Sequence, residues 1–130
     1  MYNNEILDHN NYPNNYGNLD NATICSEISN ASCGDLVHIN LLVEKNTIVD
    51  AKFTGVGCAI SKAATDVVLD LLRGKTIEQA KQILNNYRAM ILGEEYNDTL
   101  LGEAKILKDI SKMPARTKCA LLPYQIIEKF

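Results

Sequence analysis

Residues 48–72 read IVDAKFTGVGCAISKAATDVVLDLL, and the spacing of their apolar side chains changes part-way along. Over residues 48–54, apolar and polar side chains alternate, as in a β-strand with one buried face. After Cys58, the apolar side chains recur at helical spacing as far as Leu72. The stretch therefore predicts a strand that passes through the turn Gly55-Val56-Gly57 into a helix that begins just after Cys58.

Two earlier segments, residues 22–29 and 36–44, alternate in the same way. Lys45-Asn46-Thr47 has the composition of a turn, so the second and third segments form an antiparallel hairpin that the first segment extends. Successive side chains in a strand point to opposite faces. The side chains expected to share the apolar face are Ile24, Ser26, Ile28, Val37, Ile39, Leu41, Val43, Val49, Ala51 and Phe53.

The rest of the chain reads as helix. Thr76-Ile77-Glu78-Gln79 resembles a capping box, and the helix that it starts is closed by Gly93. Asp98–Lys112 predicts a third helix, which Pro114 ends, and a last helix follows Cys119. Strands followed by helices predict an α+β domain, in which a three-stranded antiparallel sheet is packed on one face by the C-terminal helices.

Size and composition limit the class of protein. The 130 residues predict one domain, 1–130, with residues 1–21 as a partly flexible arm rich in Asn and Tyr. A net charge of −3 argues against a nucleic-acid partner, and the apolar runs are too short to cross a membrane. The N-terminus lacks the pattern of a secretory signal, so we expect a cytoplasmic protein with reduced thiols. Four cysteines then indicate metal or sulfur chemistry before disulfides.

The candidate site consists of Cys33, Asp35, Cys58 and Cys119. Cys33 and Asp35 are two positions apart, so in extended chain both side chains reach the same ion. Glycines and a helix N-terminus at Cys58 favour a thiolate. Cys119 follows two cations and precedes the last predicted helix, which also favours a thiolate.

Three thiolates and one carboxylate suit tetrahedral Zn²⁺, but they also suit Fe²⁺ or an iron–sulfur cluster, and spacing alone does not separate these. A carboxylate is more easily displaced from a soft metal than a thiolate, so Asp35 is a candidate to leave when sulfur enters. Cys25, on a strand face, and His38, on a polar face, are interpreted as bystanders, and His9 in the arm carries no signal.

At these residues the chain resembles the NifU/IscU N-terminal family, which works in iron–sulfur cluster assembly. The similarity covers nearly the whole length and is specific in the order and context of the three cysteines. It is carried by Ile6-Leu7-Asp8-His9, Pro13, Gly17, Cys33-Gly34-Asp35, Gly55-Val56-Gly57-Cys58-Ala59-Ile60-Ser61 and Pro114-Ala115-Arg116-Thr117-Lys118-Cys119.

Within that family, the chain departs from the IscU type. Lys118 stands where IscU-type scaffolds carry a His, Met113–Thr117 replaces their chaperone-docking segment, and the stretch between Cys58 and Cys119 is longer. These departures resemble the SufU type of the SufE/NifU-like fold. The resemblance implies a zinc site formed by Cys33, Asp35, Cys58 and Cys119, with Arg116 and Lys118 at a partner interface.

The resemblance also implies a function. We expect a zinc-dependent sulfurtransferase that accepts persulfide sulfur on Cys33 from a PLP-dependent cysteine desulfurase of the SufS type. It would work with that partner rather than as a stand-alone enzyme, and pass sulfur to downstream iron–sulfur assembly or acceptor proteins. The alternatives are an IscU-like scaffold, on which a transient [2Fe–2S] cluster or Fe²⁺ occupies the same ligands, and a structural zinc domain that only binds a partner.

Overall fold

A three-stranded antiparallel sheet and the helices on one of its faces make up the protein. The computed structural model describes residues 3–30 and 34–130, so Cys33 lies outside the described residues. The strands are β1 (Ile24–Asn30), β2 (Asp35–Glu44) and β3 (Thr47–Val56), in the spatial order β1-β2-β3. This is the α+β architecture that the sequence predicts.

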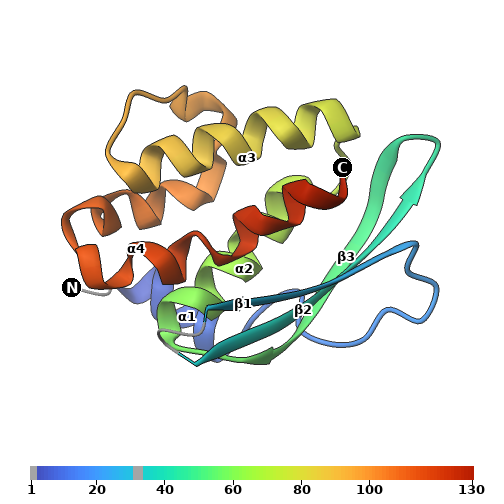
Figure 1. The fold of residues 1–130 in the computed structure, drawn as a ribbon, viewed down its shortest axis with the longest axis horizontal. Helices are drawn as coiled ribbons and strands as arrows, with labels where there is room; N and C mark the ends of the chain where they lie inside the picture. Colours follow the sequence, from blue (N-terminus) through green and yellow to red (C-terminus); the bar gives the residue numbers. More distant parts are fainter. Residues whose placement is uncertain (1–2, 31–33) are drawn as a thin grey trace.

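Helices occupy most of the remaining chain. They are α1 (Asn4–Asn11), α2 (Ala59–Leu72), α3 (Ile77–Leu92) and α4 (Pro114–Ala120), with 3₁₀ helices η1 (Asp98–Leu100), η2 (Gly102–Lys112) and η3 (Leu122–Lys129). Helices α2 and η3 lie next to the sheet, and α3 lies beyond them (Figure 1). No helix of the described chain is long and apolar enough to cross a membrane.

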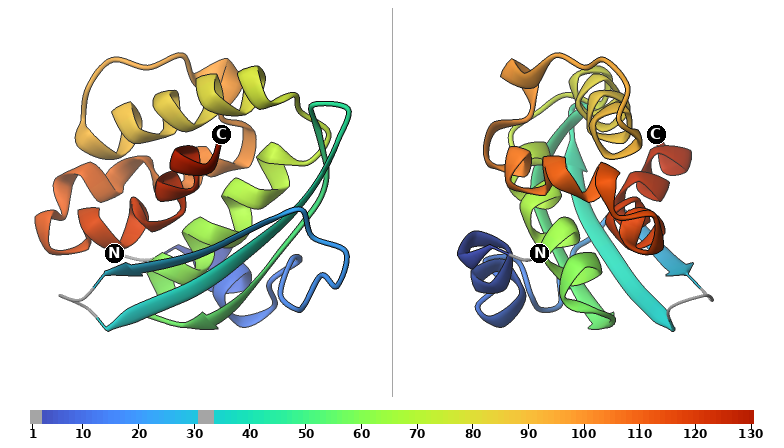
Figure 2. Two further views of the ribbon diagram at one scale, coloured as in Figure 1. Left: turned by 45° about the vertical axis from the view of Figure 1, so that its right-hand side comes forward. Right: turned by 90° about the vertical axis from the view of Figure 1, so that its left-hand side faces the viewer.

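Helix α2 is the centre of the core. It contacts α1, β3, α4, η2 and η3 (Figure 2), so most of its side chains are buried. A helix that is apolar on most of its surface is stable in water only when it is enclosed in this way. Small side chains such as Ala63 and Ala64, both fully buried, leave room for these neighbours.

The predicted sheet faces are confirmed except at Val49. Val37, Ile39 and Leu41 of β2 are completely buried. On β3, Phe53 pairs with Ile39 and Ala51 pairs with Leu41, and both are also completely buried. Val49 is 43% exposed instead, and Ile48 is buried. The register of β2 and β3 shifts between Leu42 and Val43, so Leu42 pairs with Asp50, Val43 pairs with Ile48, and Val49 is left without a partner.

The predicted helix over residues 98–112 is a pair of 3₁₀ helices, η1 and η2. A 3₁₀ helix has three residues per turn, so side chains three positions apart lie on one face. The buried side chains of this region follow that spacing: Leu101, Ala104, Leu107 and Ile110. The predicted helix is therefore present, and its apolar side chains repeat every three residues because it is of the 3₁₀ type.

The helix predicted after Cys119 is present as η3, but Cys119 itself lies in α4, a helix that was not predicted. Pro114 ends η2 as expected, but it also begins α4, because a proline fits the first helical position, whose N–H is not needed. Cys119 therefore lies in the last turn of α4, and η3 starts only at Leu122. The capping box of Thr76 and Gln79 and the left-handed Gly93 at the end of α3 are as predicted.

A buried polar network ties the N-terminal segment to α2. Asp66, in the middle of α2, is completely buried, and its two carboxylate oxygens accept the backbone N–H groups of Asn14 (3.1 Å) and Asn15 (2.9 Å). His9 Nδ1 lies 2.6 Å from Asp66 Oδ2, and His9 Nε2 lies 3.0 Å from a Glu103 oxygen. The partly flexible arm expected at residues 1–21 stays a prediction.

Both ring nitrogens of His9 face carboxylate oxygens, so the doubly protonated ring is favoured. Burial by itself lowers the pKa of His9, but the hydrogen bonds and charges of Asp66 and Glu103 outweigh it and raise the pKa above 6.5. The stabilisation from charged His9 is therefore fully present below pH 6.5 and is lost as the pH rises through the folded-state pKa.

We expect His9→Gln to lower the free energy of unfolding of the reduced, metal-free protein by about 2 kcal/mol at pH 6, because it removes a hydrogen bond to a buried charge. The difference from wild type should shrink as the pH rises, which urea denaturation between pH 6 and 8 measures. His38→Gln is the control, because His38 is exposed and the chain has two histidines. Equal pH dependence in wild type and His9→Gln would contradict this assignment.

The turn before α2 predicts a second effect. Gly55 has φ +138°, and a Cβ there would lie 2.2 Å from the Leu36 carbonyl oxygen. Gly55→Ala should therefore lower the free energy of unfolding by more than about 3 kcal/mol. Gly74→Ala is the matched control, because Gly74 also has positive φ but open space around its Cβ position, and its cost should be about 1–2 kcal/mol. Equal losses in urea denaturation would refute the close-approach argument.

Candidate metal centre

Three of the four predicted ligands meet in the structure. Asp35 is the first residue of β2, Cys58 directly precedes α2, and Cys119 lies in α4. One carboxylate oxygen and the two Sγ atoms lie within 4.8 Å of one another. Segments far apart in the sequence thus bring two thiols and a carboxylate to one point, and the position of Cys33 relative to them stays a prediction.

The fold positions Cys58 as the N-cap of α2. Its backbone is extended, and its Sγ accepts the Ser61 backbone N–H at 3.4 Å. This position normally carries an oxygen side chain, because the first N–H groups of a helix have no partner within the helix. The helix N-terminus also favours negative charge at this position.

Asp35 is held by one of its two oxygens. Oδ1 accepts the Cys58 backbone N–H at 3.0 Å and lies 3.1 Å from Ser61 Oγ. Oδ2 is buried and has no hydrogen-bond partner among the described residues. A buried carboxylate oxygen without a donor is costly, and a cation at that position removes the cost.

Gly57 leaves the room that this arrangement needs. A Cβ at Gly57 would lie 2.4 Å from Ser61 Oγ and 2.8 Å from Asp35 Oδ1. Any other residue would push these two groups apart. The second glycine of the turn therefore serves the hydrogen bonds around Asp35, whereas the first allows the strand to pass close to Leu36.

Cys119 is completely buried, and its sulfur lies 3.9 Å from Asn30 Nδ2. Because it lies in the last turn of α4, a helix N-terminus does not stabilise its thiolate, contrary to the sequence-based argument. On the same helix, Lys118 is exposed and Arg116 is half-buried. A positive ion next to the sulfur is the natural partner for a thiolate at so buried a position.

The donor set fits a borderline-soft ion. Two thiolates and a carboxylate oxygen are among the ligands that zinc binds in proteins, and with one more ligand they complete its usual four. The orphaned Oδ2 of Asp35 and the buried Sγ of Cys119 are the observations that favour a bound cation over an ordinary polar cluster.

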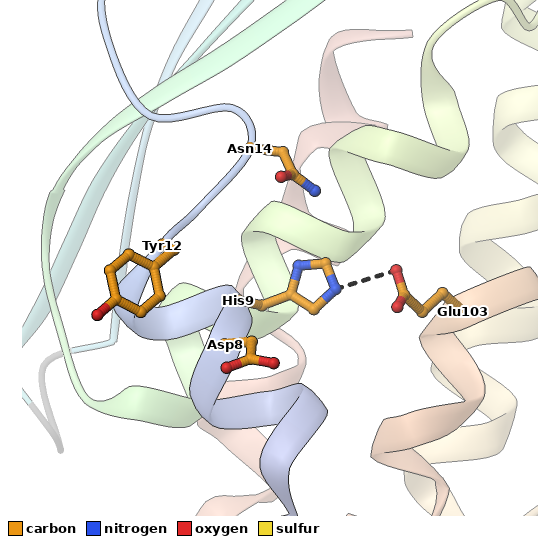
Figure 3. A pocket seen from close by; sticks show the side chains of 5 residues that line it. All are labelled: Asp8, His9, Tyr12, Asn14 and Glu103. Atoms are coloured by element: carbon orange, nitrogen blue, oxygen red, sulfur yellow. Dashed lines mark hydrogen bonds and ion pairs between the residues drawn. The ribbon is translucent and has the colours of Figure 1, made fainter.

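A second group in the described chain also has ligand atoms within 4.8 Å of one another: His9, Asp66 and Asp70. Figure 3 shows the neighbouring pocket, lined by Asp8, His9, Tyr12, Asn14 and Glu103, with the His9 ring pointing toward the Glu103 carboxylate. The Asp66 oxygens are already used by protein donors, and the Arg73 guanidinium binds Asp70. We therefore interpret this group as the attachment of the N-terminal segment.

Sequence reasoning missed two residues near these groups. His9 was given no role, although the charged Asp66 in an otherwise apolar helical run signalled that a buried partner was needed. Ser61 was also missed, although it lies three positions after Cys58 in the first turn of the helix. Cys25 is exposed on β1, and His38 is exposed on β2, and their interpretation as bystanders stays a prediction.

Comparison with known proteins confirms the resemblance. The model of the NifU-like N terminal domain matches residues 1–120. The zinc-dependent sulfurtransferase SufU of Bacillus subtilis is 37% identical over 130 residues, 99% of this chain and 88% of that protein. The iron–sulfur cluster assembly scaffold protein IscU of Thermotoga maritima is 35% identical over 129 residues, covering 99% of this chain and 91% of the relative.

Solved structures agree with these relatives. The crystal structure of an iron–sulfur cluster assembly scaffold protein for the SUF system from Fervidobacterium islandicum superposes with a TM-score of 0.94 at 38% identity. The match covers 98% of this chain and 94% of the other. Both kinds of comparison extend over the segments that carry Asp35, Cys58 and Cys119. The chain belongs to the NifU-like N-terminal domain family.

Proposed function

We propose that this protein is a zinc-dependent sulfurtransferase of iron–sulfur cluster assembly that accepts sulfur from a cysteine desulfurase. The observations that carry the proposal are the meeting of Asp35, Cys58 and Cys119 at one point and the buried Asp35 Oδ2, which has no hydrogen-bond partner among the described residues. The SufU relative, which matches 99% of this chain, is named a zinc-dependent sulfurtransferase.

Cys33 completes the site in this proposal. It precedes Asp35 by two residues, so the length of the chain keeps their Cα atoms within about 7 Å. Cys33, Asp35, Cys58 and Cys119 would then hold Zn²⁺ with four ligands. When bound, zinc would keep the three sulfur atoms as thiolates close to one another and limit their oxidation.

The sulfur-transfer step is a thiol–persulfide exchange. The Cys33 thiolate attacks the outer sulfur of the persulfide on the desulfurase, a new S–S bond forms, and the old one breaks. The desulfurase cysteine leaves as a thiolate, and Cys33 carries the sulfur as a persulfide. Exposed Lys118 and half-buried Arg116 on α4 are proposed to contact the desulfurase.

A scaffold is the second candidate, because IscU relatives are also similar over nearly the full length. In that case the same ligands would hold a [2Fe–2S] cluster in place of zinc. Anaerobic reconstitution with iron, sulfide and a SufS-type cysteine desulfurase separates the two. A stable chromophore that is transferred to an apo-ferredoxin would favour the scaffold over the sulfurtransferase.

The zinc site predicts thermal stabilisation of the folded protein. At about a hundredfold excess of free Zn²⁺ over its dissociation constant, the free energy of unfolding should rise by about 3 kcal/mol, or roughly 8 °C in Tm. Cys58→Ser and Cys119→Ser should lose most of this shift, measured by calorimetry on reduced protein. Cys25→Ser is the control, because Cys25 is exposed on β1, and it should keep the shift. An unchanged shift in Cys119→Ser would remove that thiol from the site.

The sulfur-acceptor role predicts a different pattern. Cys33→Ser should abolish the stimulation of a SufS-type desulfurase, measured as alanine released from cysteine, because the attacking thiol is gone. Cys25→Ser should stimulate as wild type does. Mass spectrometry should detect an added sulfur on Cys33 of the wild type after the reaction. A Cys33→Ser protein that still stimulates would exclude Cys33 as the acceptor.

A further inference from the structure

Ser61 touches two of the metal-site residues, although it is not a predicted ligand. It is completely buried in the first turn of α2. Its backbone N–H points to Cys58 Sγ at 3.4 Å, and its Oγ lies 3.1 Å from Asp35 Oδ1 and 3.0 Å from the Cys58 carbonyl oxygen. A buried hydroxyl that reaches both a cysteine and a carboxylate of one site is well placed to orient them.

The Asp35 carboxylate is asymmetric because of these contacts. Two donors, the Cys58 N–H and the Ser61 hydroxyl, converge on Oδ1, whereas Oδ2 is buried without any described donor. Turning the carboxylate out of this orientation would lose both hydrogen bonds, and a half-turn only exchanges the two equivalent oxygens. The oxygen that is free to bind an ion is therefore Oδ2.

We propose that Ser61 is a positioning residue of the metal centre, whose hydroxyl holds Asp35 Oδ1 so that Asp35 binds the ion through Oδ2 alone. The proposal rests on the zinc site described under the proposed function. Groups behind a ligand commonly fix its orientation in this way, and their loss typically lowers metal affinity 10–100-fold.

The same geometry bears on how Asp35 is displaced. The Ser61 hydroxyl has one proton and two acceptors at similar distances, Asp35 Oδ1 and the Cys58 carbonyl oxygen. When Asp35 leaves the ion, the hydroxyl can turn to the carbonyl and remain hydrogen-bonded.

The test compares Ser61→Ala with Thr65→Val. Thr65 lies one turn further along α2, is also completely buried, and donates to the Ser61 carbonyl oxygen at 2.8 Å. It matches Ser61 in burial and in the loss of a hydroxyl, but its hydroxyl bonds the helix backbone. Zinc affinity is measured by competition with a chromophoric chelator. We expect a 10–100-fold loss in Ser61→Ala and a value close to wild type in Thr65→Val.

A spectroscopic signature accompanies the affinity. In Ser61→Ala, Asp35 Oδ1 loses one of its two donors and keeps only the Cys58 N–H, so the orientation of Asp35 on Co²⁺ is less well fixed, and the visible absorption of the Co²⁺-substituted protein should change in intensity and position. Thr65→Val should keep the wild-type spectrum. Equal losses of affinity in the two variants, or unchanged spectra in both, would overturn the proposal and reduce Ser61 to a packing residue.

A double-mutant cycle isolates the route through Asp35. In the Asp35→Ala background, Ser61→Ala should have little further effect on zinc affinity, because the group that it orients is absent. An undiminished loss in that background would mean that Ser61 acts through Cys58 and would overturn the proposal. Gly57→Ala crowds the same contact from the other side and should weaken zinc binding comparably, which keeps the test decisive if Ser61→Ala folds poorly.

The outcomes also separate this inference from the function on which it rests. If Asp35→Ala binds zinc as tightly as wild type, the carboxylate is not a ligand, and the proposed zinc site fails. If Asp35→Ala weakens binding but Ser61→Ala does not, the site stands and only the role of Ser61 is wrong.

Discussion

Helix α2 is enclosed on most of its sides, and each buried polar group that it carries must therefore be satisfied inside the protein. This constraint organises the molecule at two places. At the start of the helix, Ser61 turns to Asp35 and Cys58, and the strand–helix turn must bring these residues together. In the middle of the helix, the Asp66 carboxylate binds a backbone N–H of the N-terminal segment and the ring of His9. The candidate metal centre and the attachment of α1 thus follow from the burial of one helix.

The candidate metal centre places groups that are proposed to be charged inside an apolar core. Cys119 is completely buried, and Asp35 is nearly so, yet the proposed chemistry needs both as anions. An ion of opposite charge removes most of this conflict, whereas the metal-free protein has to bear it. The orphaned oxygen of Asp35 is the visible part of that cost. Stability and sulfur chemistry are therefore coupled through the same few atoms in the function that we propose.

Features that depend on neighbouring residues along the chain could be predicted from the sequence. Features that depend on contacts with distant residues could not. The alternation of β2 and the capping box of Thr76 are local patterns, and both are confirmed. Exposed Val49 was not predictable, because the bulge arises from the pairing of β3 with β2. Likewise, the surroundings of Cys119 depend on where α4 begins, and the partner of His9 lies far along the chain in α2. Residue types and order indicated the candidate metal-site residues Asp35, Cys58 and Cys119, whereas the contacts of Ser61 could be seen only in the fold.

The wide separation of these ligands along the chain has a consequence for how the protein matures. The candidate ligands lie in three separate elements: Asp35 in β2, Cys58 at the start of α2, and Cys119 in α4. Only contacts between residues far apart in the sequence bring them together. Such contacts form late, because closing a long loop costs entropy before the contact stabilises it. During synthesis, the chain emerges with Asp35 and Cys58 well before Cys119. In the function that we propose, tight metal binding thus requires a finished fold, and an incomplete chain presents only some of the proposed ligands to the metals around it.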